Sequence, residues 1–256
     1  MIILAKFRGG SYLYGLATPE SDIDERGVFL NTEISKILGI EHTQNKHLVK
    51  QNSEVDVDYS ELREFLTKIK GGATPALEAL WAPDDAFEVT TPLFDVVRRN
   101  RERLTDVRKV AGGFDGYLRN QIQAVFNASG KAEEGKARAE MISKYGYANK
   151  PAYHVMRLSE SAINLLTTGV FTVKPKRHMN ICWNLKCNPL TFKPEEVKTM
   201  MENAYEKFDE AFKESQFMDR KFDDELANNI LLSAYTPFIN KARYQVAMKE
   251  DLCGML

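Results

Sequence analysis

The feature that most limits how the beginning of this chain can fold is a glycine turn. It lies between two segments whose residues favour β-strands. Residues 2 to 7 are rich in β-forming side chains and end at Gly9-Gly10, which predicts a strand that runs into a tight turn. A short helix is expected over residues 11 to 16, before the break at Pro19. The segment 22 to 30 then alternates and ends in β-forming residues, so it is predicted to form a second strand.

A third strand is predicted further along, after a loop with a short helix at residues 31 to 47. Val55 and Val57 alternate with acidic residues, and alternate residues of a strand point to opposite faces. One face of this strand is therefore expected to be apolar. The other face is expected to carry Glu54, Asp56 and Asp58.

Helical spacing replaces the alternating pattern after the third strand. A helix is expected from Ser60, as its N-cap, to Gly71-Gly72, and another between Pro75 and Pro83. The fold class is therefore predicted to be α+β, with a small mixed β-sheet unit at residues 1–92 and a larger α-helical unit at residues 93–256. Helices are expected at 92 to 110, 113 to 129, 132 to 146, 150 to 168, 193 to 217 and 221 to 248, and a strand only at 169 to 173.

Composition narrows the class of protein. The 256 residues are 43% hydrophobic and 28% charged, as in a globular protein with a substantial core. A net charge of −1 gives no global basic field, so a nucleic-acid partner would need a local basic patch. Three unpaired cysteines and a short apolar start fit a cytoplasmic protein without a signal peptide or membrane span.

The acidic pair Asp22 and Asp24 is a candidate metal site. Residues i and i+2 of a strand share a face, and two carboxylates at that spacing repel each other unless a cation neutralises them. Oxygen ligands of this kind suit Mg²⁺, and a third carboxylate on a neighbouring strand would complete a site for two Mg²⁺ ions. Asp56 and Asp58 share a face, so spacing alone leaves both as candidates for that third ligand.

The glycine turn is a candidate phosphate site. Glycine lets the backbone approach a phosphate closely, and backbone N–H groups at the start of a helix point towards an anion. Gly10 and Ser11 would then hold the phosphates of a nucleotide, although the segment lacks the Gly-Lys-Ser/Thr ending of a Walker motif. Asp-x-Asp alone is more often a capped turn or a solvated strand edge, but its combination with the turn and a third acidic strand favours a metal–phosphate site.

Three stretches resemble the nucleotidyltransferase superfamily of DNA polymerase beta, and more narrowly its predicted members from bacteria and phages. They are GSYLYGLATPESDIDERGVF, DVDYSELREFLTKIKGGATPALEALW and NKPAYHVMRLSESAINLLTTG, within roughly residues 8 to 170. Registering the second stretch on Leu62 and Phe65 implies that Asp56 is the third metal ligand. The resemblance also matches Glu78 to a Leu-Glu-x-Leu turn, whereas Thr74-Pro75 stands where the family usually has Asn-Pro.

The third stretch places Lys150, His154 and Arg157 at helical spacing i, i+4 and i+7, so they are expected to share one helix face. Such a stripe of cations is either solvated or directed at an anion. With the resemblance, it is expected to bind the β- and γ-phosphates and the leaving pyrophosphate. The basic segment at 173 to 178 could contact an RNA backbone, although short basic loops are usually only solvated.

The resemblance implies a metal-dependent nucleotidyltransferase that transfers a nucleoside monophosphate from an NTP to a hydroxyl and releases pyrophosphate. Two Mg²⁺ ions held by Asp22, Asp24 and Asp56 are expected as cofactors. The family's association with RNA repair favours an RNA or tRNA 3′ end as acceptor. A protein or small-molecule hydroxyl is the alternative acceptor, and a non-catalytic nucleotide-binding module on the same fold is the alternative class, against which the three aspartates argue.

Overall fold

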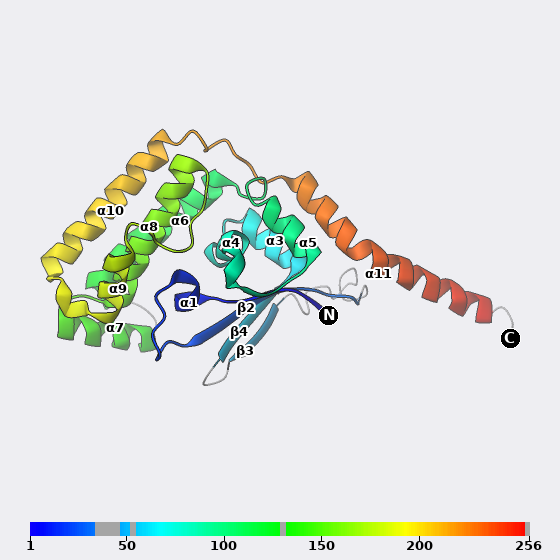
Figure 1. Ribbon diagram of the computed structural model, residues 1–256, viewed down its shortest axis with the longest axis horizontal. Coiled ribbons are helices and arrows are strands. Elements are labelled where there is room, and N and C mark those ends of the chain that lie inside the picture. The colour runs from blue at the N-terminus through cyan, green and yellow to red at the C-terminus, as the bar shows by residue number, and fades with distance from the viewer. Residues whose placement is uncertain (34–46, 52–54, 129–131, 254–256) are drawn as a thin grey trace.

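A five-stranded mixed β-sheet forms the centre of the N-terminal part of the computed structural model, which describes residues 1–33, 47–51, 55–128 and 132–253 (Figure 1). The strand order is β3-β4-β2-β1-β5. Neighbours pair antiparallel except β2 and β4, which run parallel. The strands are β1 (Ile2–Arg8), β2 (Ile23–Leu30), β3 (His47–Gln51), β4 (Val55–Glu61) and β5 (Phe87–Thr90).

Short helices accompany the sheet. The helical spacing of apolar residues after the third strand corresponds to the buried face of α3 (Leu62–Lys70). The buried residues on this face are Leu62, Phe65, Leu66 and Ile69. The N-cap of α3 is Glu61 rather than the expected Ser60, because the Glu61 carboxylate accepts a hydrogen bond from the Arg63 backbone N–H at 2.8 Å. These helices are α1 (Gly10–Tyr14), α3 (Leu62–Lys70), α4 (Thr74–Trp81) and α5 (Pro92–Arg99), with a 3₁₀ turn η1 (Asp84–Ala86) before β5.

Longer helices form the rest of the molecule. α8 packs against α6, α9 and α10, and it is buried on most of its circumference, as expected of a central helix. α11 contacts α3 and then extends away from the body of the molecule (Figure 1). The elements are α6 (Val107–Phe126), α7 (Ala132–Tyr145), α8 (Asn149–Thr168), α9 (Met179–Cys187), η2 (Pro189–Thr191), α10 (Pro194–Glu214) and α11 (Asp224–Cys253).

The predicted α+β class, with a small mixed sheet followed by a larger helical part, is confirmed. The boundary near residue 92 stays a prediction, and it falls at the start of α5, which contacts α4 and β1. The expected short helix between residues 31 and 47 lies almost entirely outside the described residues. No helix in the described part of the chain is long and apolar enough to cross a membrane.

Three local predictions were wrong. The break expected between residues 110 and 113 lies at 100–106 instead, because Asp106 caps α6 and the buried Val110, Ala111 and Phe114 carry the helix through its glycines. Residues 169–173 form no strand: Phe171 and Val173 are buried in the hydrophobic core, without a neighbouring strand to pair with. α9, whose few buried residues leave a weak periodic pattern, was not predicted at all.

Candidate functional site

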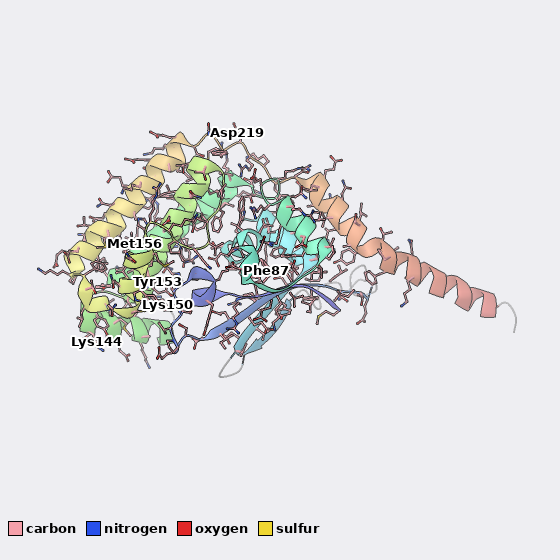
Figure 2. The ribbon with its side chains drawn as sticks, in the orientation of Figure 1. Phe87, Lys144, Lys150, Tyr153, Met156 and Asp219 are labelled. Carbon is pink, nitrogen blue, oxygen red and sulfur yellow. The ribbon has the colours of Figure 1, made fainter. Side chains whose placement is uncertain are left out.

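A cavity of about 690 Å³ lies where the sheet and α1 face α8 and α9. This volume is within the range of small-molecule sites, about 300–1,000 Å³. Lys150 and Tyr153, which line the cavity, lie at the end of α8 that approaches α1 (Figure 2). From the sequence-predicted set, Gly10, Ser11, Asp22, Asp24, Lys150 and His154 line it, whereas Asp56 and Arg157 do not.

The two glycines bring the turn before α1 into direct contact with β2. A Cβ atom on Gly10 would lie 2.0 Å from the Asp24 carboxylate oxygen Oδ2, and one on Gly9 would lie 2.6 Å from the Arg26 side chain. Gly10 also has φ +54, a conformation that side chains disfavour. The Gly9 N–H donates to the Asp24 carbonyl at 2.7 Å. Only glycine therefore fits here, and the turn is held against the acidic strand.

Parallel pairing aligns the acidic residues of β2 and β4. Asp24 lies opposite Asp56, and Arg26 lies opposite Asp58. The Arg26 guanidinium joins the two strands, because it donates to Asp24 Oδ1 and to Asp58 Oδ2, each at 2.8 Å. One oxygen of Asp24 and the charge of Asp58 are thus already neutralised by Arg26.

The opposite face of β2 has a separate set of charges. Glu25 accepts a hydrogen bond from the Tyr59 hydroxyl at 2.6 Å and forms an ion pair with Lys6 at 2.7 Å. The Lys6 and Tyr59 contacts lower the pKa of Glu25 against the opposing effect of burial, which is the largest single influence on it. The strand therefore separates a cavity face, with Asp24 and Arg26, from a face stabilised by its own ion pairs.

The donor set of the cavity fits a divalent cation that is bound together with a nucleotide. No three His, Cys, Asp or Glu side chains of the described residues are grouped closely enough to hold a metal ion by themselves. Mg²⁺, however, is typically held by one or two carboxylates and completes its shell with substrate phosphates and water. Asp22 and Asp24 supply such oxygens at the cavity wall, with the Oδ2 atom of Asp24 turned towards the glycine turn.

Arg157 is buried and does not line the cavity, so it does not join Lys150 and His154 in the stripe that was expected to bind phosphates. Its side chain is 2% exposed, and Nη1 donates to Glu78 Oε1 at 2.7 Å. The guanidinium also lies 3.5 Å from the centre of the Tyr14 ring, and the Tyr14 hydroxyl donates to Glu78 Oε2 at 2.8 Å. Arg157 therefore connects α8 to α4 and α1, and positions the helix that follows the glycine turn.

Replacing Arg157 by Met should lower the free energy of unfolding by about 3 kcal/mol, because the Glu78 carboxylate then stays buried without its cation. Adding Glu78→Gln should recover part of this loss. Urea denaturation of the single and double variants tests both statements. Arg119→Met, at an exposed ion pair of α6, is the control and should stay near wild type. Equal destabilisation of the single and double variants would contradict the coupling.

His154 lines the cavity as a neutral ring rather than as a cation. Burial, with the nearby charges of Arg157, Lys150 and Lys186, lowers its pKa to about 3. The ring stacks on Tyr153 with centroids 4.5 Å apart, and its Nδ1 atom is buried without a hydrogen-bond partner in the described part of the chain. A neutral imidazole can donate or accept one hydrogen bond to a ligand but adds no positive charge.

His154 should make the protein less stable in acid. The group binds its proton near pH 6.5 when unfolded and only near pH 3 when folded, so its contribution is present above pH 6.5 and is lost as the pH falls. The expected loss between pH 7 and pH 5 is about 2 kcal/mol. His154→Gln should remove this part of the pH dependence, as measured by urea denaturation at both pH values. Identical pH slopes in the two proteins would exclude a depressed pKa.

Lys186 is a cavity residue that the sequence did not reveal, because α9 itself was not predicted. Its ammonium group donates to the Leu16 carbonyl at 2.6 Å and to the Ser21 hydroxyl at 3.2 Å, and burial lowers its pKa. Lys150 lines the same wall from α8. The cations that the long helices contribute to the cavity are therefore Lys150 of α8 and Lys186 of α9, rather than three residues of one helix.

A glycine turn held against Asp-x-Asp, with a further acidic strand paired in parallel beside it, defines a nucleotidyltransferase of the DNA polymerase beta type. The comparison with family models agrees. Residues 2–228 match RlaP, the RNA repair pathway DNA polymerase beta family, and the chain belongs to this family. The match includes α9 and α10, beyond the stretch in which motifs resemble the superfamily. A search of curated proteins gave no match.

Proposed function

We propose that this protein transfers a nucleoside monophosphate from an NTP to the 3′ hydroxyl of an RNA. The acceptor oxygen forms a bond to the α-phosphorus, and the bond from that phosphorus to the bridging oxygen of the β-phosphate breaks. Pyrophosphate leaves, and the hydroxyl proton passes to a carboxylate and then to solvent. The product is an RNA longer by one nucleotide.

The observation that carries this proposal is the contact between Gly10 and Asp24 at the cavity wall. It places a backbone turn without side chains directly beside a carboxylate. A phosphate that is close to the turn is then close to the acidic strand as well, where a cation can contact both. A solvated strand edge would need neither the two glycines nor a cavity.

The carboxylates have distinct roles in the proposed reaction. Asp22 and Asp24 would hold Mg²⁺ with the triphosphate, and Asp56 would hold a second ion and accept the proton of the attacking hydroxyl. When bound, the ions would stabilise negative charge on the phosphate oxygens. Asp56 lies opposite Asp24 in the sheet register, and Asp58 is already paired with Arg26. These two facts support Asp56 as the third ligand, although it is Asp58 that lines the cavity.

The cations and neutral polar groups that line the cavity would bind the phosphates of the NTP. Lys150 and Lys186 supply positive charge, Ser11 a hydroxyl and His154 a neutral hydrogen-bonding group. A charge-assisted contact with a phosphate contributes ~1.5–3 kcal/mol, which is enough to orient the leaving pyrophosphate. Arg157 would act indirectly, because its contacts with Glu78 and Tyr14 hold α1 in place.

Transfer of label from each α-³²P-NTP, with Mg²⁺, to a single-stranded RNA tests the proposal. RNA with a free 3′ hydroxyl should become labelled and longer by one nucleotide with at least one NTP. The same RNA with a 3′ phosphate should stay unlabelled. Asp24→Asn is the control for contaminating activity.

The other outcomes separate the alternatives. Label found only in protein or in a small-molecule fraction of a lysate would replace RNA by that acceptor. Tight NTP binding without labelling of any fraction would instead indicate a non-catalytic nucleotide-binding module. Either result would overturn the proposed RNA transfer.

A further inference from the structure

Positive charge is concentrated in one stretch of the helical part. Residues 161–194 contain no Asp or Glu, whereas the whole chain has 36. The same stretch contributes five cations, so the rest of the protein carries 30 Lys or Arg against those 36 acids. The five are Lys174, Lys176, Arg177, Lys186 and Lys193. A protein that is nearly neutral overall therefore has a local basic segment, which includes α9.

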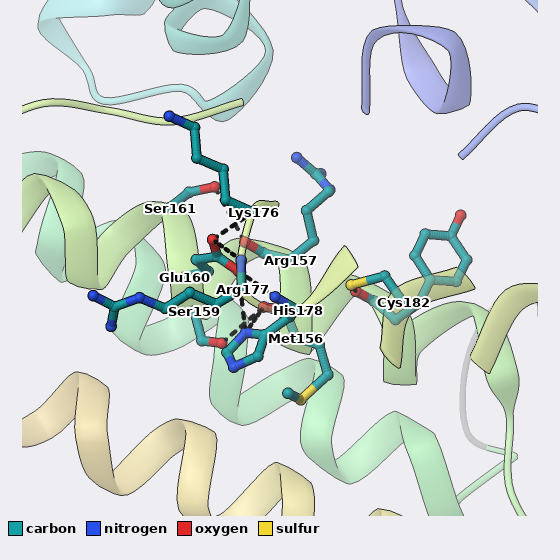
Figure 3. A network of polar contacts seen from close by, with 10 residues as sticks. Met156, Arg157, Ser159, Glu160, Ser161, Lys176, Arg177, His178 and Cys182 are labelled. Carbon is teal, nitrogen blue, oxygen red and sulfur yellow. Dashed lines mark hydrogen bonds and ion pairs between the residues drawn. The ribbon is translucent and has the colours of Figure 1, made fainter. Parts of the chain in front are cut away.

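The basic loop before α9 has a fixed backbone. The Glu160 carboxylate of α8 accepts hydrogen bonds from the backbone N–H groups of Lys176, Arg177 and His178, at 2.7, 2.9 and 2.9 Å (Figure 3). The side chains of Lys176 and Arg177 point away from this network in Figure 3. The Glu160 carboxylate is therefore bound to the backbone of the loop and does not pair with its side-chain cations. Those cations, Lys174, Lys176 and Arg177, are exposed at the surface.

An exposed aromatic side chain lies between the loop and the cavity. Trp183 is 39% exposed, and it precedes Lys186 by three residues, so the two side chains are neighbours on α9. Lys186 in turn lines the cavity. The axial distance from the start of α9 at Met179 to Lys186 is about 10 Å. The loop cations, Trp183 and Lys186 thus follow one another along the chain from the exposed loop to the candidate catalytic site, and this succession is called the α9 path.

We infer that this path, the surface formed by Lys174, Lys176, Arg177 and Trp183 up to the cavity residue Lys186, binds the single-stranded 3′ end of the acceptor RNA. Cations that follow a phosphate backbone, combined with an aromatic ring on which a base stacks, are the usual means of binding single strands. No ion pair of the described residues involves Lys174, Lys176 or Arg177, so their charges are free for phosphates. The inference rests on the proposed function, because it names the binding surface for that acceptor.

Fluorescence anisotropy with a labelled single-stranded RNA, without NTP, measures binding separately from transfer. Trp183→Leu should weaken binding about 5- to 150-fold, the range for loss of one stacked base, and Trp183→Phe should retain most of the affinity. The triple variant Lys174→Gln, Lys176→Gln and Arg177→Gln should reduce the slope of log K against log salt by about 2. The loop should keep its anchor in this variant, because Glu160 contacts backbone atoms alone.

A matched control changes three exposed lysines of α10, Lys198, Lys207 and Lys213, to Gln. This variant should bind RNA with nearly the wild-type salt slope. RNA should also quench the fluorescence of Trp183 in the wild-type protein and leave that of Trp183→Leu unchanged, because the other tryptophan, Trp81, is buried.

The outcomes distinguish this inference from the proposed function. Wild-type RNA affinity in both α9 variants would overturn the inference even if RNA is labelled by the enzyme. Weakened RNA binding in both would support it even if no nucleotide is transferred, in which case the proposed reaction fails alone. Binding of an acidic protein in place of RNA, lost in the same variants, would also overturn it.

Discussion

Asp24→Asn should lower the rate of nucleotidyl transfer by at least ~10³-fold, on the scale of losing a group that stabilises transition-state charge. The substitution removes the negative charge that faces both the glycine turn and the Arg26 guanidinium. It keeps the size of the side chain, so the fit of Gly10 against residue 24 is preserved. Asp22→Asn should have a comparable effect, because both residues line the cavity.

The neighbouring residue provides a matched control for Asp24. Glu25→Gln makes the same chemical change one position further along β2, on the face that carries Lys6 and Tyr59. It should leave transfer near the wild-type rate. Binding of Mn²⁺ with a non-hydrolysable NTP, followed by electron paramagnetic resonance, should weaken in Asp24→Asn and not in Glu25→Gln. Transfer by Asp22→Asn or Asp24→Asn within a few-fold of wild type would exclude the two-metal mechanism.

The cavity face of the sheet could be predicted because its cause is local. Side chains alternate between the two faces of a strand whatever surrounds it. Alternation alone therefore separates Asp24 from Glu25 on β2, and puts Asp56 and Asp58 on the same face of β4. The glycine turn could also be predicted, because Gly9 and Gly10 are adjacent in the sequence and directly follow a strand-forming segment. The bridge from Asp24 to Asp58 through Arg26 could not be predicted, since it depends on how two strands 32 residues apart are aligned.

The contribution of α8 and α9 to the cavity could be predicted only in part from the sequence. Helical spacing correctly placed Lys150, His154 and Arg157 on one helix, α8, but spacing does not specify what packs against a helix. Arg157 faces α4 and α1 and is buried with Glu78, whereas Lys150 remains exposed. Lys186 comes from α9, and the Gly-Val-Phe-Thr-Val segment before that helix favours a strand locally. Burial of Phe171 and Val173 against helices overrides that preference.

The third carboxylate gives the second large expected effect: Asp56→Asn should lower the transfer rate by about 10³-fold, and Asp58→Asn by about tenfold. Asp56 and Asp58 differ in what already neutralises them. Asp58 accepts a hydrogen bond from Arg26 Nη1 at 2.8 Å, so its charge balances a resident cation. No ion pair or hydrogen bond involves the Asp56 side chain in the described residues, and its position opposite Asp24 lets it share a cation with that residue.

Arg26 makes this ranking testable in a second way. Arg26→Gln removes the contact with Asp58 and also the contact with Asp24, so it should cost at least as much as Asp58→Asn. If Asp58 acts mainly by holding Arg26, the double variant should be little worse than Arg26→Gln alone, because the Asp58 contact is already lost in that single variant. Asp56→Asn combined with Arg26→Gln should instead multiply the two losses. Single-turnover transfer rates of these variants, at saturating NTP and Mg²⁺, measure the comparison. A larger loss in Asp58→Asn than in Asp56→Asn would assign the third metal ligand to Asp58, the acid that lines the cavity.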